Sequence, residues 1–461
     1  MEKLKKFLDS KFYIPIVFIF SFIFWMIAYL SKNIWNDGSI FIKIENISLI
    51  SFGVIAAILL ILFKNIYYFI PWVIFIPFVF ARPFDALTIP NCIFIGLGIM
   101  ALGLVLNVII YKPKIKLGKF FWGLLVLCVA FVLGGINLKT ENSTFQFLLT
   151  TLCVVAFLSL YSLIASSSRV EINEIARLFT YLGVFLSFQT IICFLLTEES
   201  VFFFFIIKGV NVGWGINNNV ALMLLLTFPF TLYLAMNNKN FKTIIYTLIA
   251  FFQILSIFLT CSRGAIISFM VGSILLVPYL IWKMKDKISF LSTAIVIVVI
   301  LVICTYTYSI NNPDEFNKIL EVLSQVNFDS FNGRTPIYEE CINILKENPL
   351  FGEGILAGFQ PNENGDVVYE WGHSTIFQTA RSLGIVGCIA MVAHLVQKYF
   401  VLLRKPSVWK VMVVASFAIS GLYGLFDVSY YFINYMIPLI LGMAMLEFEF
   451  HNDEEDNYEV V

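Results

Sequence analysis

Charged side chains are scarce in this 461-residue chain. Asp, Glu, Lys and Arg make up 13% of it, whereas a soluble globular protein carries about a quarter. This shortage excludes an ordinary water-soluble domain. Hydrophobic residues, 60% of the chain with 49 phenylalanines among them, take the place of the missing charge. The 30 basic and 30 acidic residues cancel, so net charge points to no nucleic-acid partner. Composition indicates a polytopic membrane protein.

Paired cysteines and a cleavable leader are also missing. The eight cysteines include no C-x-x-C pair and mostly lie in apolar runs, so we interpret them as small buried hydrophobic residues. The first apolar run, 14–30, has no small-residue cleavage site and exceeds the ~7–15 residues of a signal-peptide core. We expect it to be a retained membrane helix.

Long apolar runs, by contrast, are abundant. A helix needs about 20 apolar residues to cross the ~30 Å hydrocarbon core of a membrane. Fourteen runs are candidates, although the third is short and contains proline: 14–30, 47–63, 66–81, 92–111, 120–136, 145–165, 178–197, 219–236, 243–260, 265–282, 288–308, 376–400, 409–427 and 431–449. Because the runs are continuous rather than alternating, a membrane barrel is excluded. We predict an all-α bundle of 12–14 transmembrane helices.

The distribution of Lys and Arg orients these runs, because cytoplasmic loops are enriched in both. With a cytoplasmic N-terminus, 20 of the 30 basic residues fall in cytoplasmic segments, and the acidic C-terminal tail lies in the cytoplasm too. We therefore expect eleven helices in 1–309, one large extracytoplasmic loop at 310–374, and three further helices with the tail in 375–461. A loop of this length is usually functional.

The long loop is predicted to contain two helices. Asn312 caps the first and Pro313 opens it, while Thr335 caps the second and Pro336 opens it. Arg334 directly precedes the second helix, where free backbone N–H groups favour an anion. The loop holds eleven acidic and three basic residues, a net charge of −8. An anion bound here must therefore be held by a few placed arginines rather than by a broad basic surface.

Four arginines fall on the predicted outer side. Arg263 lies in a short turn between two spans, beside Gly264, and its guanidinium offers a planar fork of donors suited to phosphate. We interpret Arg263 and Arg334 as anion ligands. For Arg82 and Arg381, substrate contact and interfacial anchoring remain alternatives.

Other polar residues stand where loops enter spans. Asn217 and Asn219 belong to an Asn run that either forms the helix entry or hydrogen-bonds sugar hydroxyls. His373, one of only three histidines, ends the long loop in the sequence YEWGHSTIFQ. Imidazole accepts protons near neutral pH, so it is a candidate base. Glu370 is a candidate partner that orients the ring, and Glu370 or Asp329 is an alternative base. We predict no metal site.

Several of these motifs occur in one order. G-x-N-N-N-x-A enters one span and SRG follows a later span; GR, ENPLFGEG, H with F-Q, and L-G-I-V-G come next. This order resembles the O-antigen ligase and polysaccharide polymerase (Wzy-type) superfamily over about residues 205–390. The resemblance implies a membrane glycosyltransferase that uses glycans on undecaprenyl diphosphate. It also implies that Arg263 and Arg334 bind the carrier diphosphate and that His373 is the catalytic base.

The sequence departs from the family pattern at three positions. Tyr338 stands where the family usually has Trp, and we expect it to contact substrate. Ser374 stands in place of Asn after the histidine, which bears on how the ring is oriented. Ser382 stands where an acidic residue often precedes the L-G pair.

We predict a polymerase that joins lipid-linked repeat units of capsule, exopolysaccharide or O-antigen at the outer face of the bacterial cytoplasmic membrane. The mechanism is expected to be metal-independent, cofactor-free and inverting. Its partners are the lipid-linked glycan and membrane lipid, with a flippase and a chain-length regulator as candidates, and no nucleic acid. The near alternative is a ligase that moves finished glycan to another acceptor. A transporter of a lipid-linked sugar or solute is less favoured, because no internal repeat is visible and His394 is the best case of a polar residue within a span.

Overall fold

The computed structural model describes residues 1–33, 38–80, 91–138, 143–196, 209–324, 334–355, 359–361, 367–369 and 371–458. Among them, nine helices are long and apolar enough to cross a membrane, and five shorter apolar helices accompany them. These helices coincide in order with the fourteen predicted runs. The all-α fold class is confirmed, and the chain is a multi-pass membrane protein. A short antiparallel hairpin, β1 (Phe359–Pro361) with β2 (Val367–Tyr369), is added to the helices.

The chain divides into two compact units. Unit 1 consists of Met1–Lys114, Ser166–Ile319 and Phe448–Val461. Its elements are α1 (Glu2–Leu8), α2 (Tyr13–Asn33), α3 (Gly38–Leu62), η1 (Ile66–Phe69), α4 (Ile70–Phe75), η2 (Ile76–Phe78), α5 (Asn91–Tyr111), α8 (Ile172–Leu195), α10 (Asn217–Asn237), α11 (Phe241–Leu259), α12 (Arg263–Lys283) and α13 (Lys287–Asn311), with the start of α14 (Pro313–Ser324).

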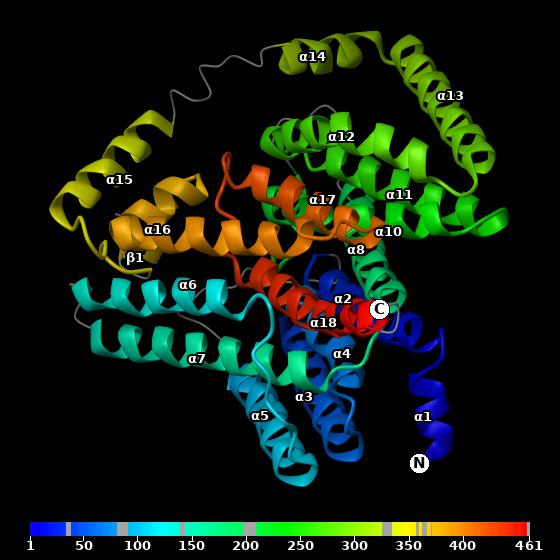
Figure 1. Cartoon of the computed structure of the whole chain (residues 1–461). Helices are drawn as coiled ribbons and strands as arrows, with labels where there is room; N and C mark the ends of the chain where they lie inside the picture. The colour runs from blue at the N-terminus through cyan, green and yellow to red at the C-terminus, as the bar shows by residue number, and fades with distance from the viewer. Residues whose placement is uncertain are drawn as a thin grey trace. The chain divides into compact units, whose positions relative to one another are not determined.

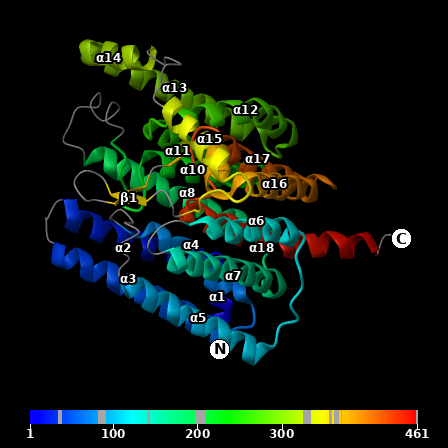
Figure 2. The ribbon, with the colours of Figure 1, turned by 90° about the vertical axis from the view of Figure 1, so that its left-hand side faces the viewer.

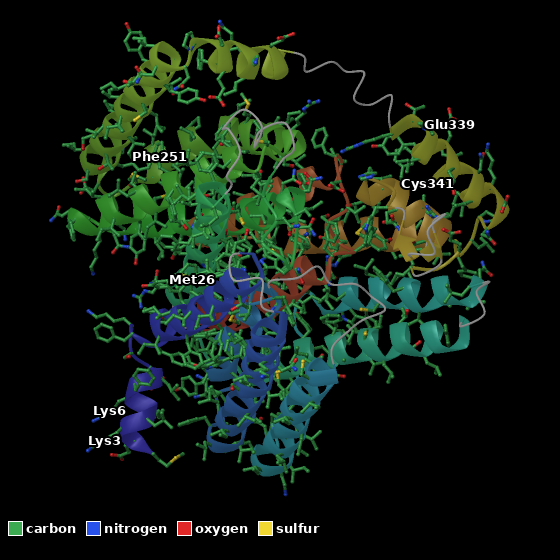
Figure 3. The ribbon with its side chains drawn as sticks, turned by 180° about the vertical axis from the view of Figure 1, so that it is seen from behind. Lys3, Lys6, Met26, Phe251, Glu339 and Cys341 are labelled. Carbon is green, nitrogen blue, oxygen red and sulfur yellow. The ribbon has the colours of Figure 1, made fainter. Side chains whose placement is uncertain are left out.

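Small residues and one buried helix organise unit 1. Gly53 of α3 and Gly96 of α5 allow close packing, because a Cβ on Gly53 would lie 2.5 Å from the Gly96 carbonyl oxygen. Figure 2 shows α3 and α5 side by side. Helix α10 is buried along almost its whole length and packs against α8 and α11. At the N-terminus, the exposed Lys3 and Lys6 project from α1 (Figure 3).

Unit 2 consists of Ile115–Ala165 and Leu320–Glu447. It contains α6 (Phe121–Gly134), η3 (Gly135–Asn137), α7 (Ser143–Ser167), α15 (Thr335–Glu347), the hairpin, α16 (Thr375–Leu403), α17 (Val408–Tyr423) and most of α18 (Ile433–Tyr458). The predicted second loop helix is α15, on which Cys341 is buried and Glu339 is exposed (Figure 3). Helix α6 packs against α16.

The start of α6 is capped by side chains from other helices of unit 2. Glu447 of α18 accepts hydrogen bonds from the Phe120 backbone N–H at 3.2 Å and the Tyr161 hydroxyl at 2.6 Å. Gln397 of α16 accepts one from the Gly123 N–H. These bonds satisfy N–H groups that the first helical turn leaves free.

Helix α16 is two helices joined at a break. Gly384 has φ +64° and ψ −159°, and Figure 1 shows α16 as two segments meeting at an angle. A Cβ on Gly384 would lie 2.5 Å from the Leu350 backbone, so the break requires glycine. The predicted single span 376–400 is wrong in this respect. The short first segment ends at Leu383, and only the second, longer segment continues to Leu403.

The segment after α15 binds the broken backbone of α16. Four backbone hydrogen bonds join them: Glu353 N–H to Arg381 C=O (3.0 Å), Gly354 N–H to Ser382 C=O (3.0 Å), Ile385 N–H to Pro349 C=O (2.9 Å) and Val386 N–H to Leu350 C=O (3.2 Å). The break would otherwise leave these groups without partners inside a membrane protein. The motifs ENPLFGEG and L-G-I-V-G are therefore the two halves of one structural joint.

Candidate functional site

His373 stands two residues before α16 in an unusual backbone conformation. Its φ is +43°, a value that costs a non-glycine residue free energy and persists only where neighbours hold it. On either side, the Gly372 N–H donates to the Gln378 side chain at 2.8 Å and the Thr375 N–H donates to the Gly424 carbonyl at 2.7 Å. The His373 side chain is 38% exposed, so the ring is anchored yet accessible.

A buried carboxylate faces one side of this ring. Asp427 Oδ1 lies 3.7 Å from His373 Nδ1, within ion-pair distance, and that nitrogen has no hydrogen-bond partner among the described residues. The carboxylate is itself held by the Tyr423 hydroxyl at 3.1 Å and the Val428 N–H at 2.8 Å. Burial raises the pKa of the Asp427 carboxyl. The His373 imidazole and the two hydrogen bonds oppose this and hold that pKa below its ordinary value.

This arrangement has a defined chemical capacity. A carboxylate on the Nδ1 side stabilises an imidazolium and fixes the ring, which leaves Nε2 to accept a proton from a bound hydroxyl. Among the described residues, Asp427 is thus a candidate for the ring-orienting role that the sequence interpretation gave to Glu370. It was missed because it lies at the end of the predicted span 409–427. A lone acid between two apolar runs is the signal that could have revealed it.

Arg334 is attached to the same part of the molecule. It precedes α15, as predicted, and its Nη1 donates to the backbone carbonyl of Phe426, the residue before Asp427. Guanidinium has five N–H donors, so this bond leaves others for an anion. Residues 424–432, which we call the α17–α18 segment, therefore contact both Arg334 and His373.

Tyr338 also lies against the His373 region. Its ring stacks on Phe377 of α16, with centroids 4.1 Å apart and planes 11° apart. Its hydroxyl donates to the His373 carbonyl at 3.4 Å. At the position where the family usually has Trp, Tyr338 thus joins α15 to the start of α16.

Arg381 is buried and pairs with Glu353 across the joint at Gly384. An Arg–carboxylate pair here reinforces the four backbone hydrogen bonds of that joint. This contact gives Arg381 a structural position, and its predicted contact with substrate stays a prediction.

The remaining predicted residues of unit 1 lie at helix starts. Arg263 is the exposed first residue of α12, after a turn in which Cys261 has φ +53° and Thr260 Oγ1 accepts the Ser262 N–H at 3.3 Å. Asn217 begins α10 and is buried, whereas Asn219 is half-buried. Their substrate contacts stay predictions.

Arg82, Glu370 and Asp329 lie outside the described residues. Within the described part of the chain, no group of three or more His, Cys, Asp or Glu side chains could hold a metal ion.

The sequence matches one family model, described as O-antigen ligase, over residues 248–392. The match contains Arg263, Arg334, Tyr338, His373 and Arg381, and it ends before Asp427. It confirms the resemblance to the O-antigen ligase and polymerase superfamily, whose members are enzymes that act on glycans. A search of the curated proteins finds no match.

Proposed function

We propose that this chain is a membrane glycosyltransferase that polymerises oligosaccharide repeat units carried on undecaprenyl diphosphate. The products would be capsule, exopolysaccharide or O-antigen chains. The observation that carries the proposal is the His373–Asp427 pair next to the Arg334-bound α17–α18 segment, in a chain that matches the O-antigen ligase family model.

The proposed reaction is a single displacement. A hydroxyl of the acceptor glycan loses its proton to His373 Nε2 as its oxygen attacks the anomeric carbon of the donor. The bond from that carbon to the diphosphate oxygen breaks, and the configuration inverts. Asp427 stabilises the imidazolium that forms. General-base assistance of this kind is typically worth ~10²–10⁴-fold.

The leaving group needs cationic stabilisation because negative charge grows on the diphosphate. Arg334 is proposed as one ligand through the N–H groups that Phe426 does not use. Arg263 is proposed as a second, because the family match covers both arginines. Losing one such donor costs about 10²–10³-fold in other enzymes. No metal or cofactor takes part in this scheme.

The proposed reaction occurs at the outer face of the bacterial cytoplasmic membrane, with both termini in the cytoplasm. The bias of Lys and Arg supports this orientation. Glu339 of α15 is exposed, so a cysteine at this position reports on which side of the membrane α15 lies. In a cysteine-free background, Glu339→Cys should react with an impermeant maleimide in intact cells, and Lys405→Cys only after permeabilisation. The reverse pattern would overturn the orientation.

A ligase is the second candidate, and the description of the matched family favours it. The two activities share donor and chemistry and differ in acceptor. The test uses purified protein in nanodiscs with an undecaprenyl-diphosphate-linked repeat unit. A ladder of longer glycans supports the polymerase, and carrier release only after another acceptor is added supports the ligase. No carrier release with any donor and acceptor pair would exclude both.

A further inference from the structure

Lys398 is buried inside unit 2, although it is counted with the cytoplasmic cations when orientation is predicted from sequence. It lies in the second segment of α16 and is 1% exposed. Its Nζ donates to the Tyr430 hydroxyl at 2.6 Å. The rings of Tyr399, Phe417 and Tyr430 surround it at 5.0–5.3 Å. Among the described residues, no carboxylate forms an ion pair with it.

Stability does not explain a lysine at this position. An ammonium without a carboxylate partner loses its hydration on burial, and cation–π contacts return only part of that free energy. Methionine has a similar length and would fill the same space among aromatic rings without that cost. A buried ionisable residue within a membrane span is therefore a candidate for a functional role.

The partner of Lys398 indicates what that role is. Tyr430 lies three residues after Asp427 in the α17–α18 segment. Between them, the Ser429 N–H donates to Thr375 Oγ1 at 3.0 Å, and Thr375 Oγ1 donates to the Asp427 carbonyl at 3.3 Å. Asp427 and Ser429 of the α17–α18 segment thus hydrogen-bond to the start of α16, beside His373. Tyr430 of the same α17–α18 segment hydrogen-bonds to Lys398, which lies in the part of α16 after the break.

A second basic residue of α16 contacts Tyr430. The His394 ring, one helical turn before Lys398, meets the Tyr430 ring edge-on at 5.7 Å and is 1% exposed. Two residues of α16, His394 and Lys398, therefore contact the Tyr430 side chain. The bond to Lys398 is the hydrogen bond that the Tyr430 hydroxyl makes within the described part of the chain.

We propose that Lys398 is a positioning residue: by holding the Tyr430 hydroxyl it fixes the α17–α18 segment and keeps the Asp427 carboxylate beside His373. The effect of Lys398 on catalysis rests on the proposed function. The effect of Lys398 on the His373–Asp427 contact is independent of that function and can be measured without substrate.

The test compares Lys398→Met with Lys405→Met, a matched change at an exposed lysine just beyond α16. Tyr430→Phe is the second variant, since it removes the hydroxyl and keeps the ring. Each full-length protein is purified in nanodiscs with ¹⁵N-labelled histidine. The chain has three histidines, so His394→Gln and His451→Gln assign the signals and leave those of His373. Asp427→Asn provides the reference for a lost carboxylate.

Lys398→Met should have an unfolding temperature equal to or above that of the unchanged protein. Its His373 ¹⁵N signals should move toward those of Asp427→Asn, as should those of Tyr430→Phe, while Lys405→Met stays unchanged. Chain growth should fall on the order of tenfold, as expected when one charge-assisted contact is lost. In the Asp427→Asn background, Lys398→Met should add less than a twofold loss.

Unchanged His373 signals in both Lys398→Met and Tyr430→Phe would refute the proposal, whatever the unfolding temperature. The proposal would also be refuted if Lys398→Met lowered chain growth tenfold in the Asp427→Asn background, as much as it does in the unchanged protein. If the unchanged protein releases no carrier, the proposed function fails, and the ¹⁵N comparison still decides the role of Lys398.

Discussion

Each unit contains a buried polar cluster, and the two clusters differ in one decisive respect. In unit 1, Gln253 of α11 hydrogen-bonds Thr231 of α10 at 3.0 Å and the Thr180 carbonyl of α8 at 3.4 Å. All three residues are neutral and buried. In unit 2, Asp427 is charged and faces a histidine that is 38% exposed. We call the first cluster closed, because its three residues are buried and hydrogen-bond to one another. We call the second cluster open, because the His373 side chain is accessible from outside.

The comparison teaches that burial of polar groups alone does not mark an active site in a membrane bundle. Interhelical hydrogen bonds such as those of Gln253 contribute to helix association, typically about 0.6 kcal/mol each and up to ~1.7. A charged group held against an accessible titratable ring has a different use, because it can stabilise a proton received from outside. Function should therefore be sensitive to changes in the open cluster and insensitive to changes in the closed one.

The largest effect is expected for His373→Ala. Removing the proposed base should lower chain growth by ~10²–10⁴-fold with little change in folding, because the side chain is partly exposed. Growth is measured as glycan ladders at matched protein levels, with His451→Ala in the C-terminal tail as the control. Growth equal to that of the unchanged protein would remove His373 from the mechanism.

Asp427→Asn should have the next largest effect. It keeps the shape of the side chain and removes the charge that stabilises the imidazolium. If the carboxylate closes on the imidazolium as it forms, the charged contact is worth ~1.5–3 kcal/mol, which corresponds to a loss of about 10- to 100-fold. Rates measured at saturating and at limiting donor concentration distinguish an effect on the chemical step from an effect on donor binding. The loss should appear in kcat, and a loss confined to KM would mean that Asp427 binds substrate instead.

Gln253→Met tests the closed cluster. The change removes the hydrogen bonds to Thr231 and Thr180 and keeps the volume, so unfolding free energy should fall by about 1 kcal/mol. Chain growth per folded molecule should stay within twofold. Thermal unfolding in nanodiscs and the ladder assay measure the two quantities. A tenfold loss of growth at full folding would break the distinction between the clusters.

The smallest effect is a difference in pH dependence. The pKa of Asp427 is lower in the folded protein than its ordinary value of 3.8. Its stabilising contribution is therefore present above about pH 4 and is lost as pH falls through the lower folded-state pKa. The gap in unfolding temperature between the unchanged protein and Asp427→Asn should narrow as pH falls to about 3. The gap for Gln253→Met should not depend on pH, since that cluster is neutral.

Much of the helical architecture could be predicted from the sequence. Apolar runs predicted the positions of the fourteen apolar helices in the described part of the chain, though not the break within α16, because hydrocarbon requires continuous apolar length. Proline after a polar residue predicted that α14 begins at Pro313, as it does, since proline suits the first helical turn. It placed the start of α15 at Pro336, one residue after the observed first residue Thr335. Arg334 and His373 were selected from loop position and from the resemblance, and the structure brings both to the α17–α18 segment.

The break at Gly384 and the role of Asp427 could not be predicted. Glycine in L-G-I-V-G is also compatible with an unbroken apolar helix, and its φ is set by a segment some 30 residues earlier. Asp427 lies 54 residues after His373, and no local pattern encodes a contact over that separation. Both features depend on tertiary hydrogen bonds, which residue spacing along the chain does not reveal.

The break in α16 makes the orientation of its His373 end independent of the length of its membrane-spanning part. A continuous helix would couple these two properties. In an unbroken helix, each inserted residue adds 1.5 Å of length and rotates everything before it by about 100°. Here the first segment carries the His373 end, and the joint with 349–354 fixes its direction at Gly384. Beyond Lys398, the second segment can therefore lengthen or shorten at its Leu403 end to suit a thicker or thinner bilayer without turning the histidine away from its carboxylate.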